Sequence, residues 1–170
     1  MADLTPLGAR AARGSAADMF LKLQGVTGEA GDKDHKGEIE VVSWSWGMKA
    51  GTAGSKANAA VERAATIEEL QVVKNVDKSS ATLMMYLNTN RLVPKAQLTV
   101  RKAGKEALEY LKIALEQVRV SSLQVESEGS TLVERVTFGF AKVEVTYTPQ
   151  DVTGAQGGGG VVFAADLERE

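Results

Sequence analysis

Few residues of the chain could support chemistry, and His35, the single histidine among 170 residues, is the first to consider. Histidine titrates near neutral pH, and the adjacent Asp34 could orient it as a general base. No nucleophile is specified near it, and the chain contains no cysteine. A lone histidine in a polar turn is more often structural, so we expect no catalytic residues and an exposed His35 ring.

Asp32, Asp34 and Gly37 imitate the start of a calcium loop, in which oxygen ligands at alternate positions precede a glycine turn. The match then fails, because Lys36 occupies the fifth position and Ser43 stands where a bidentate glutamate should close the site. The flanking residues are also typical of strands rather than helices. We interpret the segment as a solvated turn, and we expect no metal-ligating residues.

Trp44 and Trp46 lie on one face of a predicted strand, where paired indoles can stack on a sugar or a base. The other interpretation, packing in a core or an interface, is the more common one. The glycine run from Gly157 to Gly160 lacks the Lys and Ser or Thr of a phosphate-binding loop, so it is typical of a linker. No cofactor is therefore expected, and a hydrolytic enzyme is the least supported function.

The composition narrows the function classes further. With a formal net charge of -2, the chain has no long-range positive field that would attract nucleic acid. The 44% hydrophobic and 25% charged fractions are those of a soluble globular domain. No apolar run is long enough for a transmembrane helix, and Met1 to Asp18 lacks the core of a signal peptide. We expect synthesis in the cytoplasm without Sec export, and no membrane insertion.

Apolar residues alternate with period two along most of the chain, which predicts half-buried strands. These runs cover residues 19–24, 39–46, 70–76, 95–101, 111–125 and 136–147. Their phase slips at Val41 and Val42, at Ser121 and Ser122, and near Ala141, and one extra residue at such a point is a β-bulge. A strongly coiled sheet needs such slips in order to close. The fold predicted is mainly β, a small closed antiparallel β-barrel, with a tight sandwich as the alternative.

One segment has helical spacing instead. Asp77 or Ser79 could cap a helix over about 77–88, in which Leu83, Met84 and Leu87 recur on one side. A helix this short is marginal in water unless its apolar face packs on the rest of the fold. We therefore expect one short α-helix packed beside the barrel.

The chain divides into a flexible N-terminal extension over 1–17, a barrel domain over 18–151, and a glycine-rich tail over 152–170. The tail either adds a last edge strand or stays disordered. Inside the barrel domain, residues 47–66 form a long loop rich in Gly, Ala and Ser. Loops of this length in compact domains are usually functional or mobile.

Residues 18–47, DMFLKLQGVTGEAGDKDHKGEIEVVSWSWG, closely resemble the opening of Hcp (haemolysin-coregulated) proteins of bacterial type VI secretion systems. Three further blocks agree with that family: KNVDKSSATLMMYL over 74–87, EYLKIALEQVRVSSLQV over 109–125 and VTFGFAKVEVTYTPQD over 136–151. The resemblance covers most of the chain from Asp18 onward. The extension over 1–17 precedes the point where such proteins normally begin.

The resemblance implies a homohexameric ring whose copies stack into the inner tube of a contractile machine, with secretion to the extracellular space or a target cell. The partners implied are other copies of the chain, the spike protein, the contractile sheath and secreted effectors. The long loop would reach from one ring toward the next. Its assembly residues are then Gly47, Met48, Lys49, Ala50, Gly51, Thr52, Ala53, Gly54, Ser55 and Lys56. The alternative function is a stand-alone β-barrel module that binds a ligand on Trp44 and Trp46.

Overall fold

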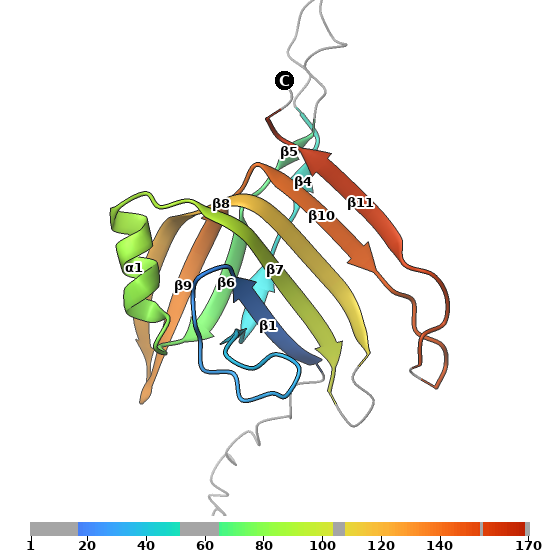
Figure 1. The fold of residues 1–170 in the computed structure, drawn as a ribbon, viewed down its shortest axis with the longest axis horizontal. Helices are drawn as coiled ribbons and strands as arrows, with labels where there is room; N and C mark the ends of the chain where they lie inside the picture. The colour runs from blue at the N-terminus through green and yellow to red at the C-terminus, as the bar shows by residue number, and fades with distance from the viewer. Residues whose placement is uncertain (1–16, 52–64, 104–107, 154, 169–170) are drawn as a thin grey trace, which may run out of the picture.

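The computed structural model describes residues 17–51, 65–103, 108–153 and 155–168. These residues form antiparallel strands and one short helix (Figure 1). The elements are β1 (Ala17–Leu23), β2 (Ile39–Glu40), β3 (Ser43–Ser45), β4 (Met48–Lys49), β5 (Thr66–Ile67), β6 (Leu70–Asn75), α1 (Ser80–Asn88), β7 (Val93–Lys102), β8 (Glu109–Glu128), β9 (Thr131–Gly139), β10 (Lys142–Tyr147) and β11 (Val161–Asp166). Of the extension predicted over 1–17, residues 1–16 lie outside the described residues, and Ala17 opens β1.

The main sheet has the strand order β2-β1-β7-β8-β9-β6-β3, and its two end strands are consecutive in the chain. The backbone N–H of Val41 donates to Met19 O of β1 at 3.0 Å, while the N–H of Val42 donates to Val73 O of β6 at 2.8 Å. The segment from β2 to β3 therefore crosses from one end of the sheet to the other. The barrel is closed through this segment, and the predicted small antiparallel barrel with one helix is confirmed.

The three phase slips have different structural causes. At Val41 and Val42 the chain leaves β1 for β6, so the slip is a change of partner and the bulge predicted there is wrong. In β8 the register with β9 shifts between Val120 and Ser122, because Ser121 is an extra residue opposite the consecutive residues Phe138 and Thr137, so the bulge predicted there is confirmed. The slip near Ala141 separates β9 from β10. The phase of the apolar alternation thus depends on strand pairing, because a change of pairing changes which side chains of a strand face the core.

Apolar side chains from β1 and β6 to β9 fill the barrel, among them Leu21, Leu98 and Phe138, each 1% exposed or less. Burying one such side chain contributes roughly 1.5–3 kcal/mol. Helix α1 lies beside the barrel and packs Leu83 and Tyr86 against it (Figure 1). No helix in the described part of the chain is both long enough and apolar enough to span a bilayer.

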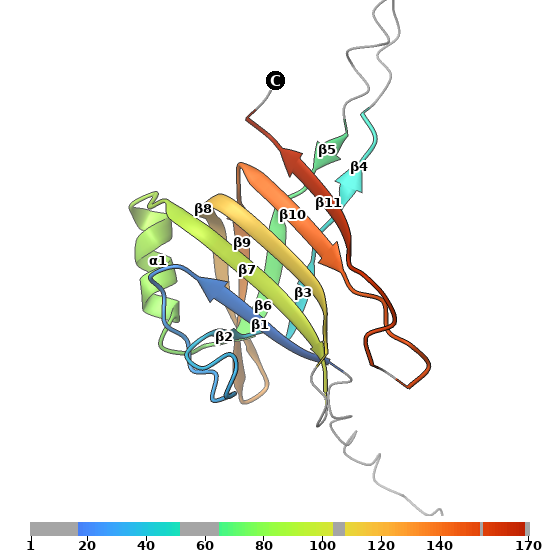
Figure 2. The same cartoon turned by 45° about the vertical axis from the view of Figure 1, so that its right-hand side comes forward.

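The last two strands project from the barrel on the side opposite α1, as both views show (Figures 1 and 2). Strand β10 pairs with the N-terminal half of β8 over residues 111–116, and β11 pairs with β10 along its whole length. We call β10 and β11 together the wing. The tail predicted from residue 152 thus returns to the sheet as its edge strand.

Candidate assembly surface

The base of the long loop is a short ladder. Strands β4 and β5 pair antiparallel, and the N–H of Glu68 donates to Gly47 O at 2.9 Å. The Nζ of Lys49 lies 2.6 Å from Glu68 Oε1. Hydrogen bonding to this carboxylate raises the pKa of the Lys49 ammonium above its ordinary value. The two ends of the loop are therefore held together where they leave the barrel.

The assembly residues expected from the resemblance are only partly visible. Gly47, Met48, Lys49, Ala50 and Gly51 belong to the described residues, and Met48 is 43% exposed. The remaining five, Thr52, Ala53, Gly54, Ser55 and Lys56, lie outside the described residues. In Figure 2, β4 and β5 stand clear of the barrel wall at the end where the loop begins. A role of this loop in stacking stays a prediction.

Trp44 and Trp46 are half-buried and pack against the hydrophobic core. Strand β3, which contains Trp44, pairs with β6 through Trp44 and Val72. Their rings thus contribute to the interior of the barrel, which is the packing interpretation of the tryptophan pair. An exposed stacking platform is not favoured by this arrangement.

His35 is buried, with 6% of its surface exposed, so the expectation of an exposed ring is wrong. Its ring stacks on Phe20 at 4.3 Å, with Nδ1 2.8 Å from Glu38 Oε2 and Nε2 2.9 Å from Glu109 Oε1. Both nitrogens donate only when the imidazole carries two protons. Burial would raise the pKa of Glu109, but hydrogen bonds from Lys112 and His35 outweigh it and hold that pKa below its ordinary value. Through its contact with Glu109, His35 links the connection between β1 and β2 to the start of β8.

Asp32, the first residue of the segment that imitates a calcium loop, binds Arg101. Arg101 donates from Nη1 and Nη2 to the Asp32 carboxylate at 3.0 and 2.6 Å, and from Nη2 to Asp18 at 3.1 Å. The hydrogen bond from Arg101 holds the pKa of Asp32 well below its ordinary range, and that of Arg101 is raised in return. A bidentate pair of this kind is geometrically specific. Within the described ranges, no cluster of three or more His, Asp or Glu could hold a metal ion.

The part of the main sheet formed by β8, β9, β6 and β3 has two edges without a partner strand among the described residues. Residues 119–128 of β8 pair only with β9, because β7 pairs with β8 no further than Val118. Next to β9 come β6 and then β3, the last strand of the order. We call the unpaired side of residues 119–128 the β8 edge and the unpaired side of β3 the β3 edge. Such edges are templates for pairing with another chain.

The two edges are protected unequally: the β8 edge carries Arg119, Glu126 and Glu128 and a register shift between Val120 and Ser122, whereas the β3 edge has no such protection. Val125 of β8 is 45% exposed, and Val42, which precedes β3, is 50% exposed. Strand β3 carries no charged residue, whereas natural solvent-facing edges are commonly blocked by Lys, Pro or a bulge. A partner strand would cover the valines and satisfy the backbone groups of both edges.

The wing carries a third edge and an exposed apolar face. In the pairing of β10 with β11, Tyr147 lies opposite Val161 and Val145 lies opposite Phe163. These side chains share one face of the wing with the buried Val143. Tyr147, Val161 and Phe163 are 48%, 66% and 41% exposed. The core face of the barrel therefore continues onto the wing, where no described residue covers it.

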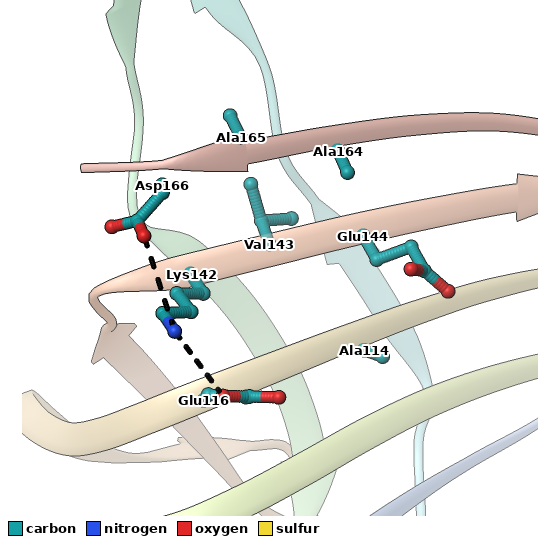
Figure 3. Close-up of a pocket in the computed structure, with 8 residues that line it drawn as sticks. All are labelled: Ala114, Glu116, Lys142, Val143, Glu144, Ala164, Ala165 and Asp166. Carbon is teal, nitrogen blue, oxygen red and sulfur yellow. Dashed lines mark ion pairs between the residues drawn. The ribbon is translucent and has the colours of Figure 1, made fainter. Parts of the chain in front are cut away.

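A shallow hollow of about 400 Å³ lies over β8, β10 and β11 (Figure 3). Lys142 stands between two carboxylates there, with Nζ 4.0 Å from Glu116 Oε2 and 3.9 Å from Asp166 Oδ2. The lining includes no histidine, hydroxyl or thiol. The charges in the hollow therefore link β8, β10 and β11, the three strands that Glu116, Lys142 and Asp166 belong to.

The sequence did not identify these edges, although it contained one signal. Strand β8 has 20 residues, while its neighbours β7 and β9 have 10 and 9. A strand that is twice as long as each neighbour leaves part of its length unpaired on one side. The apolar run over 111–125 indicated that length, but which side stays open depends on pairings between distant residues.

Comparisons with known proteins agree with this architecture. The family model described as "Type VI secretion system effector, Hcp" matches residues 20–147. The chain is similar to Protein hcp1 of Pseudomonas aeruginosa, with 40% identity over 157 residues, which is 91% of this chain and 97% of that protein. Crystallised Hcp1 from Salmonella typhimurium shares 29% identity at a TM-score of 0.71, covering 90% of this chain and 96% of its own. A structure titled as a type six secretion system protein has 26% identity and a TM-score of 0.80, covering 90% and 97%.

Proposed function

This chain belongs to the Hcp family of type VI secretion proteins, and on that basis we propose that it is a structural subunit of the secretion tube. Its copies close into hexameric rings, the rings stack, and the tube is expelled with the spike and bound effectors from within the contractile sheath. The hexamer and these partners are inferred from the family. The chain acts by assembly and carries no chemistry of its own.

The observation that supports ring formation best is the pair of unpaired edges on one sheet. The β8 edge and the β3 edge lie at opposite ends of the sequence of strands β8, β9, β6 and β3. Pairing the β3 edge of one copy with the β8 edge of the next is a head-to-tail contact, which repeats until the rotation closes a ring. Closure leaves neither edge open to aggregation.

The same proposal gives the long loop its place in stacking. Its described base, held by Lys49 and Glu68, stands at one end of the barrel, which supports a contact of the loop with the next ring. Synthesis is cytoplasmic, and export proceeds through the type VI apparatus. The family supports this route.

A charge placed on the β8 edge tests ring formation. Val125→Asp places an unpaired carboxylate between the two edges in the ring. Because burying such a charge is costly, the dissociation constant of the ring contact should rise at least about ten-fold. Native mass spectrometry across a concentration series measures this. Leu132→Asp is the matched control, because Leu132 is 52% exposed on β9, a strand with partners on both sides.

Two results would count against the proposal. Rings that are equally stable in Val125→Asp and in the native chain would place the β8 edge outside the contact. If the native chain stays monomeric at high concentration, the proposal that it forms rings is wrong. Circular dichroism of each variant verifies that the barrel is folded, which is expected because Val125 is 45% exposed.

A further inference from the structure

Helix α1 has an outer face that is unusually poor in charge. None of its residues from Ser80 to Asn88 is Asp, Glu, Lys, Arg or His, and no acidic or basic residue stands in its first or last turn. Leu83 and Tyr86 face the barrel, while Met84 and Met85 on the other side are 42% and 52% exposed. Solvent-facing helix surfaces normally carry charged residues. Methionine adapts its shape to a partner and is frequent on binding surfaces.

The wing offers a matching apolar surface. Tyr147, Val161 and Phe163 share one exposed face, and β11 carries no charge before Asp166. An exposed apolar edge strand of this kind is an aggregation site unless something covers it. Each of the two surfaces lacks a cover among the described residues of its own copy.

The positions of these surfaces fit the ring contact. Figures 1 and 2 both show α1 and the wing on opposite sides of the barrel. Helix α1 packs against β8, the strand that carries the β8 edge. In Figure 2, β3 lies on the side of the barrel that carries the wing. When a β3 edge meets the β8 edge of the next copy, the wing of the first copy approaches α1 of the second.

We propose that the wing of each copy packs over helix α1 of the next copy, with Tyr147, Val161 and Phe163 against Met84 and Met85. The inference rests on the proposed ring and specifies a second contact within it. The strand edges form one layer of the interface through backbone hydrogen bonds. The wing and the helix form a second layer through apolar contact, so the ring contact covers the β3 edge, the β8 edge and the exposed apolar face of the wing.

Cross-linking tests the contact directly, because the chain has no cysteine and introduced thiols react without background. The full-length double variant Phe163→Cys with Met85→Cys is purified as a ring by size exclusion and treated with a short bismaleimide. A denaturing gel should then show a ladder of covalent multimers up to the hexamer. The matched control pairs Met85→Cys with Val162→Cys, since Val162 is 56% exposed on the opposite face of β11.

The outcomes separate the inference from the proposed function. Rings that give no ladder with the Phe163 pair, or an equal ladder with the Val162 pair, overturn the wing contact and leave the ring intact. An absence of rings in the native chain overturns both.

A charge exchange provides the second test. Met85→Glu and Phe163→Lys should each lower ring affinity about ten-fold, and the two together should recover most of that loss. Equal loss in the double variant and the single variants would contradict the contact.

Discussion

Lys74 and Glu134 are fully buried beneath the start of α1, at positions where alternation predicts apolar residues. They are direct cross-strand partners on β6 and β9, with Nζ 2.5 Å from Glu134 Oε2 and 3.0 Å from Asp77 Oδ1. Ser80 at the first turn of the helix donates to the same carboxylate at 3.0 Å. The pair therefore ties the helix to the barrel wall, since buried ions are tolerated when they are paired and hydrogen-bonded.

Breaking this pair from one side should be strongly destabilising. In Lys74→Met the Glu134 carboxylate loses its cation at 0% exposure, so the free energy of unfolding should fall by about 3–5 kcal/mol. Urea denaturation measures the loss. The double variant Lys74→Met with Glu134→Leu is the control and should lose less, because no charge stays buried without compensation. A single variant as stable as the double would contradict this account.

Asp32 gives the protein part of its acid sensitivity. Its pKa in the folded state is held below the ordinary value of about 3.9 by Arg101. A depressed carboxyl pKa contributes stability above the unfolded value, and this stability is lost as the pH falls from there through the folded value. Asp32→Asn should therefore flatten the fall in unfolding free energy between about pH 5 and about pH 2. Parallel curves for the two proteins would show that the Arg101 contact does not supply this dependence.

The contrast between His35 and Trp44 shows how far residue types alone can be interpreted. Packing for Trp44 was one of two interpretations of the sequence, and it matches the structure because an indole on an alternating strand has a face to bury. The buried His35 was missed, because Phe20 points out of the barrel and needs a cover supplied by the β1–β2 connection. No local pattern indicates that two segments so far apart stack on each other.

Among the elements, the period-two alternation located most strands, and the helical spacing over 77–88 located the helix. The strands over 19–24, 70–76 and 95–101 correspond to β1, β6 and β7, and α1 lies within the interval 77–88. Of the two predicted caps, Ser79 occupies the N-cap position without a side-chain capping hydrogen bond, while Asp77 accepts hydrogen bonds from Ser79 in the preceding turn. The slip at Val41 and Val42 was interpreted as a bulge, like the real one in β8, because a local pattern cannot distinguish an inserted residue from a change of partner strand.

The long loop should be dispensable for rings and needed for stacks. Deleting residues 51–60 leaves Lys49 and Glu68 in place at the base, so the barrel and its edges should be intact. Electron microscopy should then show single rings at concentrations where the native chain forms tubes. Replacing the same residues by a Gly-Ser sequence of equal length separates the effect of sequence from that of length. Tubes of unchanged length in the deletion variant would contradict a stacking role.

The protomer as a whole is a barrel whose apolar surface continues beyond the core onto the wing, where no described residue of the same copy covers it. One side carries the β3 edge and the apolar wing, and the opposite side carries the β8 edge and the uncharged helix face. The sequence predicted the barrel from its periodicity and the ring from family resemblance. It could not predict which edges stay open, since that follows from pairings between strands far apart in the chain, such as β6 with β9.

The most direct test of the central claim is electron cryomicroscopy of the purified full-length chain. We expect hexameric rings with a central hole, in which the β3 edge of each copy pairs with the β8 edge of its neighbour. Particles that remain monomeric, or rings in which both edges face solvent, would contradict this claim.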